Sequence, residues 1–314
     1  MAHIGRSLLL VVRSESINDF REIARRVRKI DPAIDVLIFG DTVDPTKIPS
    51  HFLKQPLLSI YLVNPPPEDF VPQSGQLAVK GLNKLQEYEH FKKHNIPCLP
   101  IEEFKWGMTL DESIYGDWVV LKPQHIQSTG RDINMIPTKL IPTLKLEDFP
   151  EKHLIREDSY YVQKFVKTGE NATHYRAYIF LNEILLTTQS ISKITIPSIG
   201  LNIKEVLEIS VASNNQEYRN VILFEDEKIM SFALKVAATF KDIPLLGIDI
   251  LVDALTKEMY VLEVNAGGNT WAFSSEIASH FRESAGGKKK LILQYNAWDK
   301  ASEALVRKNH EIAK

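Results

Sequence analysis

Three short apolar runs, the first two separated by a helical pattern, constrain the fold of this chain most strongly. Each run is long enough for one buried strand. They are Leu8–Val12, Val36–Phe39 and Leu58–Val63. Apolar residues recur at helical spacing over residues 17–30, and Ser16 with Asp19 three residues later predicts a capped helix start. A strand–helix–strand order predicts a small parallel sheet with helices on its faces.

Length, charge and cysteine content exclude several classes of protein. The chain has 314 residues, enough for two or three compact units, and its 44% apolar fraction is typical of a soluble globular protein. Its 38 Lys and Arg balance 40 Asp and Glu, so we expect neither a nucleic-acid nor a membrane partner. Cys98 is the only cysteine, which excludes an intrachain disulfide and favours a cytoplasmic location. Composition leaves open a homo-oligomer.

A proline-rich stretch from Pro65 to Pro72 marks the first boundary. The pattern after it predicts a helix running from about Leu77 past Phe91 to His94, and residues 286–314 are also expected to be helical. The later predicted strands are Trp118–Leu121, Tyr161–Val166, Tyr175–Leu181, Ile184–Ser190, Leu246–Val252 and Met259–Val264. We therefore predict an N-terminal α/β domain over 1–75, a first helix and lid over 76–160, and an antiparallel-sheet unit over 161–314.

The last predicted hairpin carries an unusual pair of carboxylates. If its turn is centred near Thr256, Asp249 lies opposite Glu263, and Asn265 points to the same face as Glu263. Two such charges at about 5 Å would repel by roughly 3 kcal/mol at an effective dielectric near 20. A cation between them, such as Mg²⁺, would relieve the repulsion. On this interpretation Glu263→Gln leaves the metal-free protein as stable as the parent or more so. The alternative is a solvated face with both charges in water.

Three further segments are suited to anionic groups. Lys122 stands at the end of a predicted strand, where an ammonium can meet a phosphate, and the turn at Ser128–Arg131 offers backbone N–H groups. Arg176 begins an apolar strand, where its guanidinium can bind a carboxylate or an oxyanion. Each has an ordinary alternative: a lysine that reaches water, a plain turn, and a surface ion pair of Arg176 with Glu170 or Glu183.

The order of these signals resembles that of the ATP-grasp superfamily, particularly the glutathione-synthetase-like branch that adds glutamate to peptide or protein ends. The similarity extends from about Leu77 to Ser275. It implies two phosphate-binding lysines, Lys84 in NKLQ and Lys122 in VVLKP, and a phosphate loop, STGR, with Ser128 and Gly130. It implies that the backbone of VQKFV reads adenine, through Gln163, Lys164, Phe165 and Val166, and that Glu170 binds ribose. It also implies Asp249, Glu263 and Asn265 as metal ligands and Arg176 as a catalytic and substrate-binding residue.

Two departures from this family pattern concern the substrate. The segment Ala266–Trp271 replaces the usual Ser/Thr-Pro-Gly-rich continuation, and in relatives it borders the acceptor site, which implies Gly268 and Asn269 as substrate-binding residues. The Asp that usually precedes the arginine is replaced by His174-Tyr175, and we interpret His174 as a turn residue. The substrate is therefore expected to differ from known ones.

The resemblance implies an ATP-grasp fold of the α/β (α+β) class and an ADP-forming ligase. Its cofactors would be ATP and Mg²⁺ or Mn²⁺, and its partners small-molecule or peptide carboxylate and amine substrates. The carboxylate would attack the γ-phosphate, and the amine would displace phosphate, with Arg176, Lys122 and the N–H groups of 267–269 near the reacting atoms. Two alternatives stay open: a kinase that stops after phosphorylation, and a regulatory protein that binds ATP without turnover.

Overall fold

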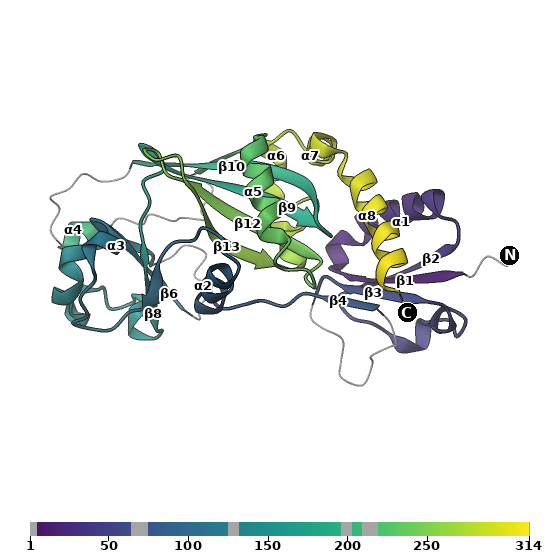
Figure 1. Ribbon diagram of the computed structural model, residues 1–314, viewed down its shortest axis with the longest axis horizontal. Coiled ribbons are helices and arrows are strands. Elements are labelled where there is room, and N and C mark those ends of the chain that lie inside the picture. Colours follow the sequence, from purple (N-terminus) through teal and green to yellow (C-terminus); the bar gives the residue numbers. More distant parts are fainter. Residues whose placement is uncertain (1–4, 64–74, 125–131, 196–202, 209–218, 314) are drawn as a thin grey trace.

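Three sheets follow one another along the length of the molecule (Figure 1). The computed structural model describes residues 5–63, 75–124, 132–195, 203–208 and 219–313. One sheet is parallel and two are antiparallel, so the predicted mixed α/β class is confirmed. In the described ranges no helix combines the length and the apolarity needed to cross a membrane.

The N-terminal sheet is parallel, as the strand–helix–strand pattern predicts. Its strands are β1 (Arg6–Val12), β2 (Ile34–Gly40), β3 (Leu57–Tyr61) and β4 (Gly75–Ala78), in the order β2-β1-β3-β4. Helix α1 (Ile17–Ile30) joins β1 to β2 and buries Phe20, Ile23 and Val27 in the core. The strands of this sheet that lie in its middle, β1 and β3, are buried almost throughout, as expected when helices or loops cover both faces.

Two local predictions in this half of the chain are wrong. Leu77 belongs to β4, and the helix that follows, α2 (Lys84–Lys93), begins only after Asn83. Asn83 and Gln86 form a capping box there, which fixes the start of the helix. The prediction that Ser16 caps α1 is also wrong, since its side chain makes no capping bond. Its hydroxyl accepts a hydrogen bond from Ser274.

The central sheet is antiparallel and carries the predicted hairpins. Its strands are β9 (Asn171–Phe180), β10 (Glu183–Thr195), β11 (Arg219–Leu223), β12 (Leu245–Val252) and β13 (Met259–Ala266), in the order β11-β10-β9-β12-β13. The turn between β9 and β10 is tight, with Leu181 and Asn182 in the left-handed region at φ 49° and 67°. Helix α5 (Glu227–Ala237) covers one face of this sheet through Phe232, Ala233 and Val236.

The third sheet lies at the end of the molecule away from the termini (Figure 1). Its strands are β5 (Ile101–Glu103), β6 (Trp118–Pro123), β7 (Asn134–Pro137) and β8 (Tyr160–Lys164), in the order β5-β8-β6-β7. Two short helices, α3 (Glu112–Tyr115) and α4 (Ile203–Glu208), pack on it. The Asn134 amide donates to the Leu207 carbonyl at 3.1 Å, which attaches α4 to β7.

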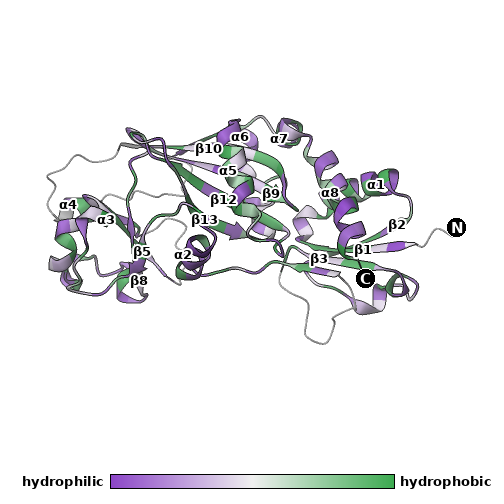
Figure 2. Cartoon of the chain, in the orientation of Figure 1, coloured by the Kyte–Doolittle hydropathy of each residue, from purple (hydrophilic) through white to green (hydrophobic). Residues whose placement is uncertain are grey.

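The C-terminal helices return to the N-terminal sheet. They are α6 (Ser279–Ser284), α7 (Lys288–Tyr295) and α8 (Ala297–Ile312), so the helical prediction for this region is confirmed. Helix α8 lies beside α1 (Figure 1), and Arg6 Nε donates to Asn309 Oδ1 at 2.8 Å. Figure 2 shows both hydrophobic and hydrophilic residues on α1 and α8, as expected for helices with one buried face.

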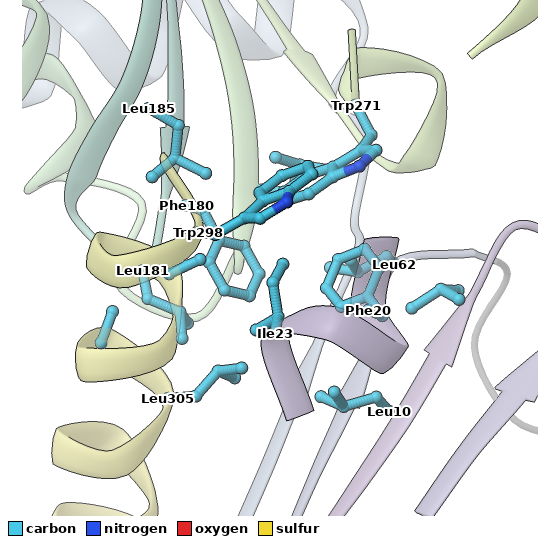
Figure 3. Close-up of a cluster of buried hydrophobic side chains, with 14 of the residues drawn as sticks. Leu10, Phe20, Ile23, Leu62, Phe180, Leu181, Leu185, Trp271, Trp298 and Leu305 are labelled. Carbon is cyan, nitrogen blue, oxygen red and sulfur yellow. The ribbon is translucent and has the colours of Figure 1, made fainter. Parts of the chain in front are cut away.

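One hydrophobic core joins the N-terminal sheet to the central sheet. In Figure 3 Phe20 lies between Leu62 and Phe180, below Trp271, and all four residues are buried. Beside this core Asp19, only 3% exposed, accepts a hydrogen bond from Trp271 Nε1 at 2.9 Å and pairs with Lys288. Lys288, the first of three consecutive lysines in the sequence, therefore neutralises a buried carboxylate.

Candidate active site

Three neighbouring strands of the central sheet carry charged residues in a row. Asp249 on β12 pairs with Arg176 on β9 and with Glu263 on β13. The predicted opposition of the two carboxylates is therefore confirmed. The register between β12 and β13 shifts directly after Asp249, so the hairpin is irregular at the charged position.

Asp249 is held by the guanidinium of Arg176. Its side chain is almost fully buried, which excludes the alternative of a solvated face for this residue. Arg176 Nε donates to Asp249 Oδ1 at 2.6 Å, and Nη2 pairs with Oδ2, a bidentate arrangement. Burial opposes the charged form of Arg176, but the Asp249 carboxylate outweighs it and raises the pKa of Arg176 well above its ordinary value. Arg176 thus pairs inward and not with Glu170 or Glu183.

Glu263 is held by Lys84 and Asn265. Lys84 Nζ lies 2.9 Å from Glu263 Oε2. The Asn265 amide donates to Glu263 Oε1 at 3.0 Å and to Asp249 Oδ2 at 3.2 Å. Burial opposes the charge on Glu263, yet Lys84 and Lys122 keep the pKa of this carboxyl well below its ordinary value. Protein cations therefore relieve the repulsion for which the sequence predicted a metal ion.

Glu87 is a buried member of this cluster that the sequence reasoning missed. It follows Lys84 by three residues on α2, and Lys84 Nζ lies 3.3 Å from Glu87 Oε2. Burial, partly offset by the charge of Lys84, raises the pKa of Glu87 to about 7. The same two carboxylates, Glu87 and Glu263, raise the pKa of Lys84 above its ordinary value in spite of burial. The sequence signal for Glu87 is its place on the helix, three residues after Lys84 and four before the buried Phe91, which puts it on the same helix face as both.

Lys122 faces the same cluster from the third sheet. Its Nζ donates to Gln163 Oε1 at 2.7 Å, between neighbouring strands β6 and β8. Burial and the charge of Lys84 lower the pKa of Lys122 to about 8. The ammonium groups of Lys84 and Lys122 act on each other electrostatically, and together they favour binding of an anion.

A small cavity opens between α2, β8 and β13. Its lining includes Lys84, Glu87, Tyr88, Cys98, Gln163 and Leu262. Cys98 forms a bridge with Val261, so the segment after α2 joins the edge of the central sheet. Two predicted site residues, Lys84 and Gln163, therefore line the same cavity as Leu262, which directly precedes Glu263.

The other predicted nucleotide-binding residues are placed less centrally. The N–H groups of Lys164 and Phe165 donate to the carbonyls of Pro100 at 2.9 Å and Trp118 at 3.1 Å. An adenine read by Gln163–Val166 would therefore have to use other backbone groups of this segment. Glu170 is exposed before β9, and no ion pair joins it to another residue in the part of the chain that the structure describes. Ser128 and Gly130 lie outside the described residues.

The loop after β13 meets the N-terminal sheet. Gly268 N donates to the Leu62 carbonyl at 2.6 Å, and Gly267 N donates to the Leu245 carbonyl at 3.2 Å. These two N–H groups hold the loop in place, so in this structure the N–H groups of Gly267 and Gly268 are not directed at an oxyanion, whereas the expected role of the Asn269 N–H stays a prediction. Asn269 is exposed beside them.

Two more basic residues face the row of charges. His174 lies within β9, paired with Ser190, and not in a turn as predicted. It shares a strand face with Arg176, and burial lowers its pKa. Arg219 lies on β11, where burial and, second to it, the nearby charge of Arg176 lower its pKa. The sequence alone gave no pairing partner for β11 and so no reason to place Arg219 here.

Comparisons with known proteins identify the fold. No model of a protein family matches the sequence, and no curated protein matches it. Among solved structures, the ATP-grasp ligase PsnB in complex with precursor peptide PsnA2 and AMPPNP is similar at TM-score 0.55 and 10% identity, over 98% of this chain and 99% of that one. The D-cycloserine synthetase DcsG is similar at TM-score 0.50 and 13% identity, over 96% and 99%. With this likeness extending over nearly its whole length, the chain has the ATP-grasp fold.

Proposed function

We propose that this protein is an ATP-dependent ligase that joins a carboxylate to an amine through an acyl phosphate, with release of ADP and phosphate. The observation that carries the proposal is the convergence of basic side chains on a compact set of oxygen donors. The basic residues are Lys84, Lys122 and Arg176, and the donors are Asp249, Glu263 and Asn265. Phosphoryl transfer depends mostly on positioning and on neutralising charge, which such a set supplies.

In this proposal the nucleotide lies between β8 and β13. Lys84 and Lys122 neutralise its phosphates, and Gln163 releases Lys122 when a phosphate oxygen replaces the amide oxygen. Glu87 keeps hold of Lys84 when Glu263 turns to another partner, because Lys84 already contacts both carboxylates. We expect nucleotide entry to widen the cavity lined by Lys84 and Gln163 through movement of the third sheet away from the central sheet.

The oxygen donors fit a magnesium ion that is shared with phosphate oxygens. In the described segments no three His, Cys, Asp or Glu side chains are grouped so as to hold a metal by themselves. Mg²⁺ is commonly bound by one or two carboxylates together with substrate phosphates, which matches Asp249 and Glu263. Rotation of the Asn265 amide would present its oxygen in place of its nitrogen. When bound, the ion would neutralise negative charge on the transferring phosphoryl group.

Arg176 and Arg219 are suited to the carboxylate that is activated. Arg176 pairs with Asp249, and Arg219 lies two strands further along the central sheet, close enough for the charges of the two arginines to act on each other. Two guanidiniums with the same charge are stabilised by an anion between them, which a carboxylate or its acyl phosphate provides. The same groups would stabilise the oxyanion that forms when the amine attacks. PsnB, which shares the fold, has been solved with Mg, ADP and a phosphomimetic precursor, and this supports a peptide as one substrate class here.

Release of ADP distinguishes this proposal from its alternatives. Carboxylates and amines, including short acidic peptides and amino acids, would be added to the protein with ATP and Mg²⁺, singly and in pairs. A ligase releases ADP at a substantial rate only when both are present. ADP release with a carboxylate alone would indicate a kinase, and absence of ADP release throughout would indicate a regulatory binding protein. We also propose that the protein is cytoplasmic, which its near-neutral charge and single cysteine support.

Binding of Mg-ATP should stabilise the fold. A ligand present at about 100 times its dissociation constant adds about 2.7 kcal/mol to the free energy of unfolding. We therefore expect saturating Mg-ATP to raise the melting temperature, and ATP with EDTA to raise it less. An unchanged melting temperature in saturating Mg-ATP would contradict the nucleotide site.

Substitution of Lys122 should weaken nucleotide binding in a pH-dependent manner. Loss of one charge-assisted phosphate contact predicts a roughly 10- to 100-fold weaker affinity for Lys122→Ala. Because the pKa of Lys122 is about 8, the parent should bind ATP best below that pH and lose affinity as the ammonium deprotonates above it. Isothermal titration between about pH 7 and about pH 9.5 measures both effects.

Lys289→Ala is the control for this prediction. Lys289 is exposed on α7, away from the charged cluster, so its variant should keep the parent's affinity and pH profile. A Lys122→Ala variant with the same profile as Lys289→Ala would remove Lys122 from the site.

A further inference from the structure

The carboxyl edge of the N-terminal sheet contains a basic residue that the proposed mechanism does not use. In the order β2-β1-β3-β4 the direction of strand addition reverses between β1 and β3. Ligands of open parallel sheets bind in the crevice at such a switch point, beyond the carboxyl ends of the strands. Arg13 directly follows β1, and Leu62 directly follows β3. The switch point therefore lies between these two residues.

The loop that follows the oxygen donors closes this edge. Gly268, three residues after Asn265, donates its N–H to the Leu62 carbonyl at 2.6 Å. A Cβ atom at Gly268 would lie 2.8 Å from Arg13 Cγ and 3.0 Å from the Leu62 oxygen. A side chain at position 268 would force Arg13 or the Leu62 backbone to shift, so the aliphatic part of Arg13 lies directly on the loop. Arg13 therefore contacts the loop at a point only three residues after Asn265, a residue of the proposed reaction centre.

Arg13 is a partly buried residue whose guanidinium has no partner in the described part of the chain. Among the residues that the structure describes, none forms a hydrogen bond or an ion pair with it. Other arginines nearby are paired: Arg25 and Arg26 with Glu22. The nearest acidic residue in sequence, Glu15, is exposed and forms no ion pair among the described residues. Asp41, which directly follows β2, accepts hydrogen bonds from the N–H and hydroxyl of Ser14. An unpaired guanidinium in a partly buried residue is stabilised by an anionic ligand.

We propose that Arg13 binds the carboxylate of the amine substrate, which is therefore an α-amino acid or a short peptide with a free C-terminus. The planar fork of arginine matches a carboxylate with two parallel hydrogen bonds. Asp41 is bonded to Ser14, the residue after Arg13, and its negative charge there repels a doubly charged phosphate more strongly than a singly charged carboxylate. The inference rests on the proposed ligase function for the fate of the amine, whereas binding of the carboxylate can be measured without turnover.

Calorimetry with the twenty common amino acids, their α-carboxamides and a set of dipeptides tests this assignment. Each would be titrated into the full chain saturated with Mg²⁺ and a non-hydrolysable ATP analogue. For the amino acid or dipeptide that binds most tightly, Arg13→Gln should weaken affinity roughly 10- to 100-fold, and Arg13→Lys should weaken it less. The matching carboxamide should bind the parent and Arg13→Gln equally. Arg25→Gln, an exposed arginine on α1, should behave as the parent.

Several results would overturn the assignment. They are equal affinity of the parent and Arg13→Gln for the carboxylate ligand, a parent that prefers the carboxamide, a parent that binds no amino acid or dipeptide, and tighter binding of inorganic phosphate at Arg13. Tight, Arg13-dependent binding without ADP release would support the carboxylate site and count against the ligase instead. Preference between amino acids and dipeptides identifies which of the two supplies the amine.

Discussion

Glu263→Gln is expected to lower ADP release by about 100-fold or more while the protein stays folded, because the amide cannot supply the second anionic ligand of the proposed magnesium ion. The structure also reverses the stability prediction made from sequence. Repulsion from Asp249 suggested that the variant would be at least as stable as the parent. Glu263 instead pairs with Lys84 at 2.9 Å and accepts from Asn265, so its charge is favourable in the folded state.

We therefore expect the metal-free Glu263→Gln variant to be less stable by about 1–3 kcal/mol, the cost of removing a charged partner from a largely buried pair. Mg-ATP should also stabilise the variant less than it stabilises the parent. Thermal melts with and without Mg-ATP, together with the ADP assay, measure all three effects. Glu258→Gln is the matched control, since Glu258 is exposed on the same hairpin. If Glu263→Gln behaves as Glu258→Gln in every assay, Glu263 has no role in the site.

The sequence predicted the pairs that depend on local geometry. Asp249 and Glu263 face each other because strand alternation and a short turn leave few registers, and the turn is fixed by Asp253, whose carboxylate accepts from the N–H groups of Leu255 and Thr256. The basic residues of the cluster could be named from the sequence, but the carboxylate that each one pairs with could not. Lys84 reaches Glu263 from a helix 179 positions earlier in the chain, and only the fold brings the two together.

Errors arose where a distant partner replaced a local one. Asp19 has the spacing of a capping residue, yet its partners are Trp271 and Lys288, more than 250 residues away. A buried carboxylate gains more from a cation and an indole N–H than from an exposed helix end. Leu77 fits a helical stripe by spacing, but the edge of the parallel sheet offers it a strand partner, with Leu77 paired to Ile60. In a segment as short as the four residues of β4, the spacing of apolar residues does not distinguish a strand from the start of a helix.

Trp271→Ala is expected to lower the free energy of unfolding by about 3–5 kcal/mol, the usual cost of removing a buried aromatic side chain. Trp271 is 1% exposed and lies where the N-terminal sheet, the central sheet and the C-terminal helices meet (Figure 3). Its ring stacks parallel to that of Trp298 with centroids 5.8 Å apart and contacts Phe20 at 4.6 Å. The substitution leaves a cavity and also takes a hydrogen-bond donor away from the buried Asp19.

Urea unfolding followed by circular dichroism measures this loss without depending on tryptophan fluorescence. Trp106→Ala is the control, because Trp106 is 47% exposed and packs only edge-on against Phe104 and Phe149, so it should lose less than half as much. Trp271→Phe keeps a ring but not the indole N–H, and it should fall between the parent and Trp271→Ala. Equal losses in Trp271→Ala and Trp106→Ala would mean that the junction between the two sheets does not depend on this ring.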